Sequence, residues 1–152
     1  KISKDGNPHA YEFPRAKITD SVYDFSFSGL KSAVLNHINH AHMMGEEINV
    51  PDLMASFQYA VVDVLTSHAV EAAKNLGYDK VAIAGGVASN SALRAEMKEA
   101  CEKAGLKFYY PSPIFCTDNA AMIGVAGYYE YINGTRSGLD LNAVPNLKLG
   151  ER

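Results

Sequence analysis

The chain has 152 residues, enough for one compact domain or for part of a larger one. Hydrophobic residues make up 47% of it and charged residues 20%, which excludes an intrinsically disordered or collagen-like protein. The formal net charge is -3, so the composition predicts no broad basic surface for nucleic acid. No apolar run approaches the roughly 18 residues that a membrane helix needs, and we expect no membrane partner.

The chain begins with Lys1 and shows no signal-peptide pattern after it, so we expect a processed chain or a piece of a longer protein. Cys101 and Cys116 are too few for a disulfide scaffold and match no zinc motif, which favours a cytoplasmic protein. The only cluster of basic residues includes Arg94 and Lys98, one helical turn apart, and a solvated helix face is the simpler interpretation.

Two helices are predicted in the first half of the chain. Apolar residues recur at helical spacing after Ser28–Gly29, and Gly45 ends the run. A second helix begins at Asn49–Pro51, which supplies a cap residue and a proline, and ends at Gly77. One apolar face is expected on this second helix, formed by Leu53, Phe57, Val61, Val64, His68, Ala72 and Leu76.

Two short strands follow, with a third helix between them. Both Lys80–Ala84 and Leu106–Tyr110 have strand composition. Ser89 and Asn90 are cap residues for the helix between them, which extends to Ala104. Strand, helix and strand within about 30 residues form a βαβ unit, so the two strands should be parallel.

The loops after these strands are the first candidate for a ligand site. Because the carboxyl ends of parallel strands lie at one edge of a sheet, Gly85–Asn90 and Pro111–Asp118 should face one crevice. The pair Gly85 and Gly86 would let a backbone approach a ligand, and the helix start that follows offers N–H groups to an anion or ribose. Taken alone, this glycine pair is also explained by a tight structural turn.

Asp118 stands where the last predicted helix begins, and that helix extends to about Ile132 and stops at Asn133–Gly134. A helix cap is the simpler interpretation of an aspartate there, and a metal ligand is the alternative. As a ligand it would need partners from elsewhere. Residues from Thr135 onward have the composition of a tail.

The histidines do not form a recognisable metal site by themselves. His37, His40 and His42 lie close in sequence but contain no His-x-x-x-His pair, so metal binding by this group is disfavoured. His68 falls on the apolar stripe of the second helix, where a hydrogen-bonded core histidine is the usual explanation. No serine nucleophile elbow is present and no cysteine has a histidine neighbour, so we assign no catalytic residue.

Three segments together change this assessment. They are Asp24–Ser32 (D-F-S-F-S-G-L-K-S), Ala84–Asn90 (A-G-G-V-A-S-N) and Phe115–Ile123 (F-C-T-D-N-A-A-M-I). In order and spacing they resemble the signatures of the universal tRNA threonylcarbamoyladenosine transferase family, whose older label is O-sialoglycoprotein endopeptidase or glycoprotease. The resemblance implies an α/β chain that forms part of an actin-like ATPase (ribonuclease H-like) lobe. A helical insertion would be followed by an α-β-α-β-α stretch with a parallel strand pair.

On this resemblance, residues 1–48 would be the end of the helical insertion, 49–134 the α/β part of the second lobe, and 135–152 a carboxyl-terminal tail. The amino-terminal lobe would be absent. The family's reaction moves a threonylcarbamoyl group from threonylcarbamoyl-AMP to N6 of adenosine 37 in tRNAs that read codons beginning with A. The expected partners are that adenine nucleotide, tRNA and accessory proteins, and the expected cofactor is an iron or zinc ion.

The resemblance also implies roles for individual residues. Asn90 would contact the nucleotide part of the substrate, with Gly85 and Gly86 lining it, and Asp118 would be a metal ligand. The chain lacks the family's His-x-x-x-His motif, its S-G-G-H-T turn and its acidic substrate-contacting segment. Asp118 could therefore supply at most one of three protein ligands, and we expect this chain alone to be inactive.

Two other functions stay open at this point. A metalloprotease of the glycoprotease type would need a metal with a general base, or a nucleophile with a base, and the sequence supplies neither. A non-catalytic scaffold would bind adenine nucleotide without transferring a group.

Overall fold

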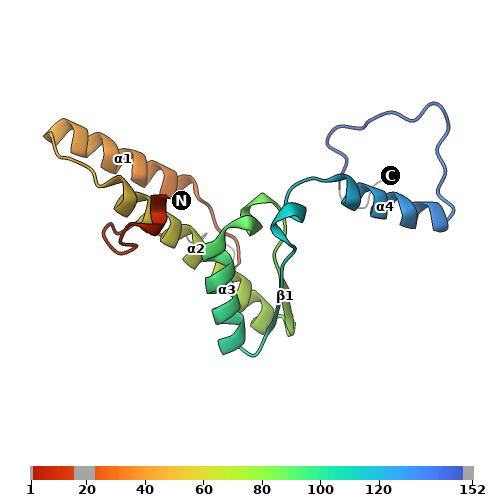
Figure 1. The fold of residues 1–152 in the computed structure, drawn as a ribbon, viewed down its shortest axis with the longest axis horizontal. Coiled ribbons are helices and arrows are strands. Elements are labelled where there is room, and N and C mark those ends of the chain that lie inside the picture. Colours follow the sequence, from red (N-terminus) through yellow and green to blue (C-terminus); the bar gives the residue numbers. More distant parts are fainter. Residues whose placement is uncertain (1, 16–22, 149–152) are drawn as a thin grey trace. The chain divides into compact units, whose positions relative to one another are not determined.

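A computed structural model describes residues 2–15 and 23–148 of the chain (Figure 1). The chain divides after Cys116 into two compact units. The main elements of the first unit are the helices α1 (Ser28–Met44), α2 (Val50–Asn75) and α3 (Ser91–Lys103) and the strands β1 (Lys80–Ala82) and β2 (Lys107–Tyr109). The second unit contains α4 (Ala120–Ile132). Three short 3-10 helices complete the list: η1 (Ile2–Lys4), η2 (Gly86–Ser89) and η3 (Pro113–Phe115).

The helix ends follow local chemistry, and the two helices predicted in the first half are confirmed. Gly45 ends α1 in the left-handed conformation, with a φ of 69°. Asn49 caps α2, because its side-chain oxygen accepts the N–H of Asp52 at 3.2 Å, and Pro51 follows in the first turn. Gly77, which follows the last cap residue Leu76 of α2, takes a φ of 73°. These signals act within a few residues of each helix end.

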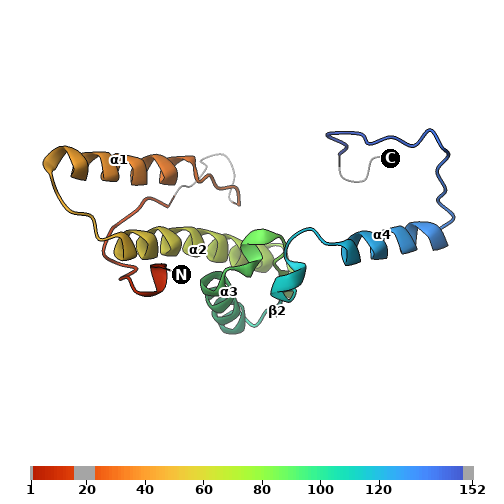
Figure 2. The same ribbon diagram turned by 45° about the horizontal axis from the view of Figure 1, so that its top comes forward.

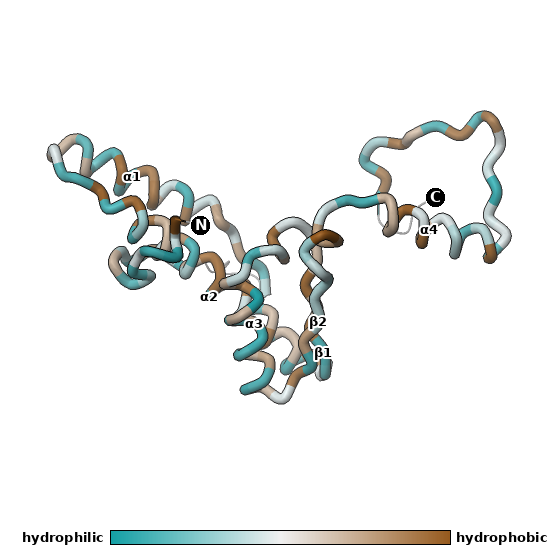
Figure 3. Tube along the Cα trace, in the orientation of Figure 1, coloured by the Kyte–Doolittle hydropathy of each residue, from teal (hydrophilic) through white to brown (hydrophobic). Residues whose placement is uncertain are grey.

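The long helix α2 connects two hydrophobic clusters in the first unit. In one, its residues Leu53 and Ala60 pack with Phe13 and Leu30, and α1 lies alongside α2 in both views (Figures 1 and 2). In the other, Val62 and its neighbours pack with α3 and the strands. Along α1, hydrophobic segments alternate with hydrophilic ones, as expected for a helix with one buried side (Figure 3).

The predicted apolar face of α2 is only partly correct. Leu53 and Val64 are buried as expected, but Leu76 is 59% exposed. The most deeply buried residues of α2 are small ones, Ala60 at 0% and Ser56 at 1% exposed. They are buried because the segment after η1 and helix α1 cover this part of α2.

The strands β1 and β2 pair in parallel, as the βαβ pattern predicts. Val81 lies opposite Phe108 in the register. The ladder extends at both ends, where Lys107 N–H donates to the carbonyl of Asp79 at 2.9 Å and Ile83 N–H to that of Tyr109 at 3.0 Å. From α2 onward the order of elements is α-β-α-β-α, which confirms the predicted fold class.

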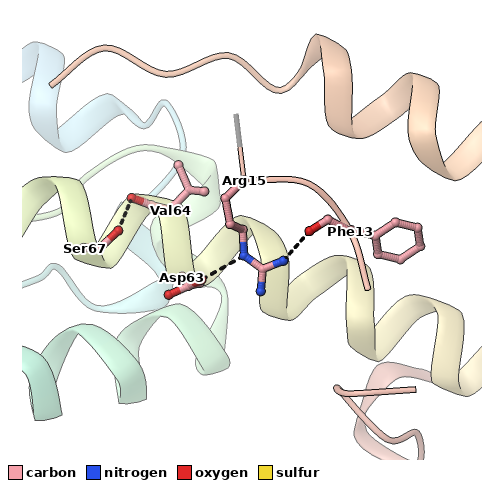
Figure 4. Close-up of polar contacts among 5 residues, drawn as sticks. All are labelled: Phe13, Arg15, Asp63, Val64 and Ser67. Atoms are coloured by element: carbon pink, nitrogen blue, oxygen red, sulfur yellow. Dashed lines mark hydrogen bonds and ion pairs between the residues drawn. The ribbon is translucent and has the colours of Figure 1, made fainter. Parts of the chain in front are cut away.

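The segment before residue 16 is held against α2 by an arginine (Figure 4). Nε of Arg15 donates to the carboxylate of Asp63 at 2.8 Å, and its Nη1 donates to the carbonyl of Phe13 at 2.6 Å. The guanidinium also lies over the ring of Tyr59, 5.1 Å from its centre. These contacts keep Phe13 in the cluster between α1 and α2.

The last helix, α4, begins close to the predicted place, but its cap residue differs from the prediction. Asn119, not Asp118, caps α4: its side-chain oxygen accepts the N–H of Met122 at 3.1 Å. A cap residue must directly precede the first helical residue and have an extended backbone, and Asn119 meets both conditions. The helix ends at Ile132, as predicted, and Gly134 takes a φ of 85° beyond it.

In residues 2–15 and 23–148, no helix has the length and apolar character needed to cross a bilayer. The predicted boundaries at residues 48 and 134 concern subdivisions of a larger fold and stay a prediction.

Candidate functional site

The turn after β1 requires a glycine for its backbone conformation. Gly85 has a φ of 83° and a ψ of 175°, a region that L side chains rarely adopt. A Cβ built there would meet no atom within 4 Å, so backbone strain, and not lack of space, is what selects glycine. Gly86 then begins η2, in which Ala88 is 1% exposed and anchors the turn. The expected glycine turn is therefore present at the carboxyl end of β1.

Asn90 caps α3, as predicted, and both its amide oxygen and its amide nitrogen form hydrogen bonds. Its Oδ1 accepts the N–H groups of Ala92 at 2.9 Å and Leu93 at 3.1 Å. Its Nδ2 donates to Oε1 of Gln58 on α2 at 3.3 Å. Ser89, the other predicted cap residue, ends η2 and is not the cap. The amide of Asn90 thus has one orientation, with its nitrogen directed to Gln58.

Two pockets lie on either side of this cap. Asn90 and Gln58 line one pocket of about 400 Å³. Its other walls are apolar except for Ser3: Ile2, Ser3, Met54, Phe57, Val61, Val62, Leu65, Val87 and Leu93. A second and almost wholly apolar pocket of about 640 Å³ extends along the end of β1 to Tyr23, Phe25 and His68. Four residues line both pockets, so α2, η2 and the start of α3 all contribute to the wall between them: Val61, Leu65, Val87 and Leu93.

Arg94 joins the two loops that follow the strands. Its Nε donates to the carbonyl of Ala88 in the turn after β1. Its Nη2 contacts the loop after β2, donating to the carbonyl of Pro111 at 2.8 Å and to Sγ of Cys116 at 3.1 Å. The guanidinium also lies 4.7 Å from the centre of the Tyr110 ring. The prediction that these loops meet at one edge of the sheet is therefore confirmed as far as Cys116.

Asp118 lies two residues further, in the second unit, and is exposed. That Asp118 faces the same crevice as Asn90 stays a prediction, because the two residues belong to different units. Asp118 was expected to cap α4, and it does not. Since Asn119 makes the capping hydrogen bond, Asp118 is not needed to begin α4.

Two of the histidines considered above, His37 and His68, have structural partners. The ring of His37 packs edge-on against Tyr11, 4.7 Å between ring centres. Nδ1 of His68 lies 3.1 Å from the carbonyl oxygen of Tyr23, and its ring contacts Phe25. A carbonyl only accepts hydrogen bonds, so Nδ1 of His68 carries the proton. Among the described residues, no group of three or more His, Cys, Asp or Glu side chains could hold a metal ion.

Sequence reasoning missed two residues of this region. Arg94 was expected on a solvated helix face, but its guanidinium is directed into the loops. Its position four residues after the cap residue Asn90 is the available signal, since that spacing places both on one side of the helix. Gln58 was missed because nothing in its neighbourhood along the chain distinguishes it from other polar residues of α2.

The chain is similar to known proteins over its whole length. Residues 1–125 match the family model described as tRNA N6-adenosine threonylcarbamoyltransferase. Proteins of that name are 58% identical in Clostridium botulinum (strain 657 / Type Ba4) and 57% identical in Clostridium perfringens (strain 13 / Type A). Each match covers 100% of this chain and 45% of the relative, so the chain spans less than half the length of these curated relatives.

Proposed function

The chain belongs to the tRNA N6-adenosine threonylcarbamoyltransferase family, and we propose that it forms part of an enzyme that modifies adenosine 37 of tRNAs reading codons that begin with A. The observation that carries this proposal is the family match over residues 1–125, which includes all three motif segments. The parallel strand pair and its flanking helices agree with the actin-like fold of the family.

The reaction is an acyl transfer from a mixed anhydride. The N6 amine of adenosine attacks the carbonyl carbon of threonylcarbamoyl-AMP, and a carbon–nitrogen bond forms. The bond from that carbon to the phosphate oxygen breaks, AMP leaves, and the amine loses a proton. The described residues hold and orient the nucleotide in this scheme, and none of them is assigned the role of nucleophile or base.

The turn from Gly85 to Asn90 is the proposed nucleotide contact. Gly85 and Gly86 are exposed and carry no side chain that would block a ribose or phosphate. The amide nitrogen of Asn90 has two hydrogens, and Gln58 accepts one of them. The second hydrogen is the proposed donor to the ribose or phosphate oxygens of the substrate. The polar pair Asn90 and Gln58 in an otherwise largely apolar pocket supports this assignment.

Asp118 is the proposed metal ligand. Its carboxylate is exposed, and the cap of α4 does not occupy it. An iron or zinc ion, when bound, would act as a Lewis acid toward an oxygen of the substrate. Asp118 supplies one ligand only, since the described residues contain no further cluster of metal-binding side chains around it. The remaining ligands would come from other parts of the intact enzyme.

The proposed partners are threonylcarbamoyl-AMP, tRNA and the accessory proteins of the pathway, and the proposed location is the cytoplasm. A net charge of -3 does not favour a large phosphate footprint on this part of the protein. Most contacts to the tRNA backbone would then be made by the remaining part of the enzyme or by its partners.

The test uses the full-length protein that contains this chain, with threonylcarbamoyl-AMP, its accessory proteins and unmodified tRNA. Mass analysis of the digested tRNA should show threonylcarbamoyladenosine, with release of AMP. Cleavage of a glycoprotein substrate without tRNA modification would favour the metalloprotease. Nucleotide binding with neither reaction would favour the scaffold.

A further inference from the structure

In the described part of the chain, Arg94 is the only residue whose side chain forms hydrogen bonds with both of the loops that follow the strands. It contacts Ala88 in the turn after β1 and Pro111 and Cys116 in the loop after β2. The stacking on Tyr110 covers one face of the guanidinium. Four contacts from one planar group leave it little freedom to rotate.

The chemistry of these contacts requires an arginine. The guanidinium presents several N–H groups in a fixed plane, so two of its nitrogens can donate in different directions at once. A lysine ammonium has a single nitrogen and cannot reach the carbonyls of Ala88 and Pro111 with the same geometry. None of the ion pairs found among the described residues involves Arg94. Its acceptors are neutral, and a salt bridge is not what holds it in place.

The two loops carry the residues of the proposed site. Ala88 is two residues before Asn90, and Cys116 is two residues before Asp118. Cys116 is buried at 2% exposed and is the last residue of the first unit. Because one guanidinium binds both Ala88 and Cys116, it restrains the turn that ends at Asn90. It also restrains the end of the loop that leads to Asp118.

We propose that Arg94 is a positioning residue that holds the nucleotide-binding turn against the loop leading to Asp118, an inference that rests on the proposed function of both segments. It acts through Ala88, Pro111 and Cys116, and it does not itself touch the substrate. Its loss would loosen both loops together and leave the helices in place. The expected consequence is weaker productive binding of the nucleotide.

The test compares Arg94→Ala and Arg94→Lys with Lys98→Ala in the full-length protein. Lys98 lies one turn further along α3, and its only ion pair in the described part of the chain is an exposed one with Glu102 at 3.8 Å. Arg94→Ala should raise the KM for threonylcarbamoyl-AMP about tenfold or more, as expected for losing hydrogen bonds from a charged group. Added guanidinium ion should recover part of this loss, Arg94→Lys should recover little, and Lys98→Ala should equal the wild type.

A second measurement is independent of activity. Hydrogen exchange should become faster in residues 85–90 and 111–116 of Arg94→Ala while α1 and α2 keep their protection. Unchanged KM, or unchanged exchange in either loop, would overturn the proposal. If Arg94→Ala does not fold, the same exchange measurement on Arg94→Lys decides. Failure of the wild-type protein to modify tRNA would instead refute the proposed function, and the exchange result would still test Arg94.

Discussion

Nδ2 of Asn90 donates a hydrogen bond to Oε1 of Gln58 over 3.3 Å, and this contact attaches the start of α3 to the middle of α2. The same Oε1 accepts the hydroxyl of Ser3 at 3.3 Å. Gln58 therefore connects the first residues of the chain, the long helix and the proposed nucleotide contact. The acceptor of the Asn90 amide nitrogen thus lies 32 residues earlier in the sequence.

Gln58→Ala should lower nucleotide affinity although residue 58 need not touch the nucleotide. Without its acceptor, the Asn90 amide loses a hydrogen bond whose net value is about 0.5–1.5 kcal/mol, or a few-fold to tenfold in affinity if it is fully transmitted. Gln58→Glu is the matched control, because a carboxylate oxygen still accepts from Nδ2. Titration calorimetry with an adenine nucleotide measures both. Equal affinity in Gln58→Ala and wild type would show that the contact does not orient Asn90.

Asn90→Ser separates the two roles of Asn90. Serine caps a helix about as well as asparagine, so the free energy of unfolding should change little. Serine lacks the amide nitrogen, however, so a polar group of the nucleotide loses its hydrogen-bond donor. Nucleotide affinity should therefore fall about tenfold. Asn90→Ala should lose the cap as well and should unfold more easily, by about 1 kcal/mol. If the serine variant binds nucleotide normally, Asn90 caps the helix and does not bind the nucleotide.

Asp118→Asn should lower metal content without changing stability, and Asn119→Ala should lower stability without changing metal content. Asp118 does not cap α4, so its replacement should leave the thermal melt of the full-length protein unchanged while lowering metal content and transfer. Asn119→Ala removes the hydrogen bond to Met122 and should destabilise the protein by about 1 kcal/mol with metal content retained. Metal analysis beside a thermal melt compares the two. Normal metal content in Asp118→Asn would show that Asp118 is not a metal ligand.

Gly85→Ala should destabilise the protein through its backbone alone. The φ of 83° strains any L residue, and a sparsely populated conformation costs about 1–3 kcal/mol. Gly29→Ala is the control: Gly29 lies in α1 without a positive φ, a Cβ there meets nothing within 4 Å, and alanine favours helix. That variant should be neutral or slightly more stable in denaturant unfolding. A neutral Gly85→Ala would contradict the conformation of the turn.

Stability should fall at alkaline pH because of Cys101. Burial raises the pKa of the Cys101 thiol above its usual value of about 9.0, so the folded state holds the proton to higher pH than the unfolded state. The contribution is complete below the pKa of the unfolded thiol and is lost as the pH rises through the folded pKa. Unfolding free energy measured across this range should decline more steeply in the wild type than in Cys101→Ala. Identical slopes would mean that the thiol titrates alike in both states.

The ends of most elements were predictable from the sequence, because capping acts over a few residues. Gly45 predicted the end of α1 and Asn49 the start of α2, and both predictions are confirmed. The parallel pairing of β1 and β2 followed from the βαβ order, which has one favoured topology. The glycine turn and the cap at Asn90 were found for the same local reasons.

The cap of α4 marks the limit of local reasoning. Asp118 and Asn119 are adjacent, and either side chain can cap a helix. The choice depends on which residue has the extended backbone directly before the helix, and Asn119 has it with a φ of -150° and a ψ of 155°. Composition alone does not distinguish the two.

Only the tertiary structure decided which side chains meet across the site. Arg94 and Gln58 resembled ordinary surface residues, since their partners lie far away in sequence: Pro111 is 17 positions from Arg94, and Asn90 is 32 positions from Gln58. The burial of Ala60 and Ser56 on α2 was equally unpredictable, because it depends on segments covering the helix from several sides. A local pattern determines where a helix begins and ends, whereas the packing of distant segments determines which of its residues are buried and which partners its polar groups find.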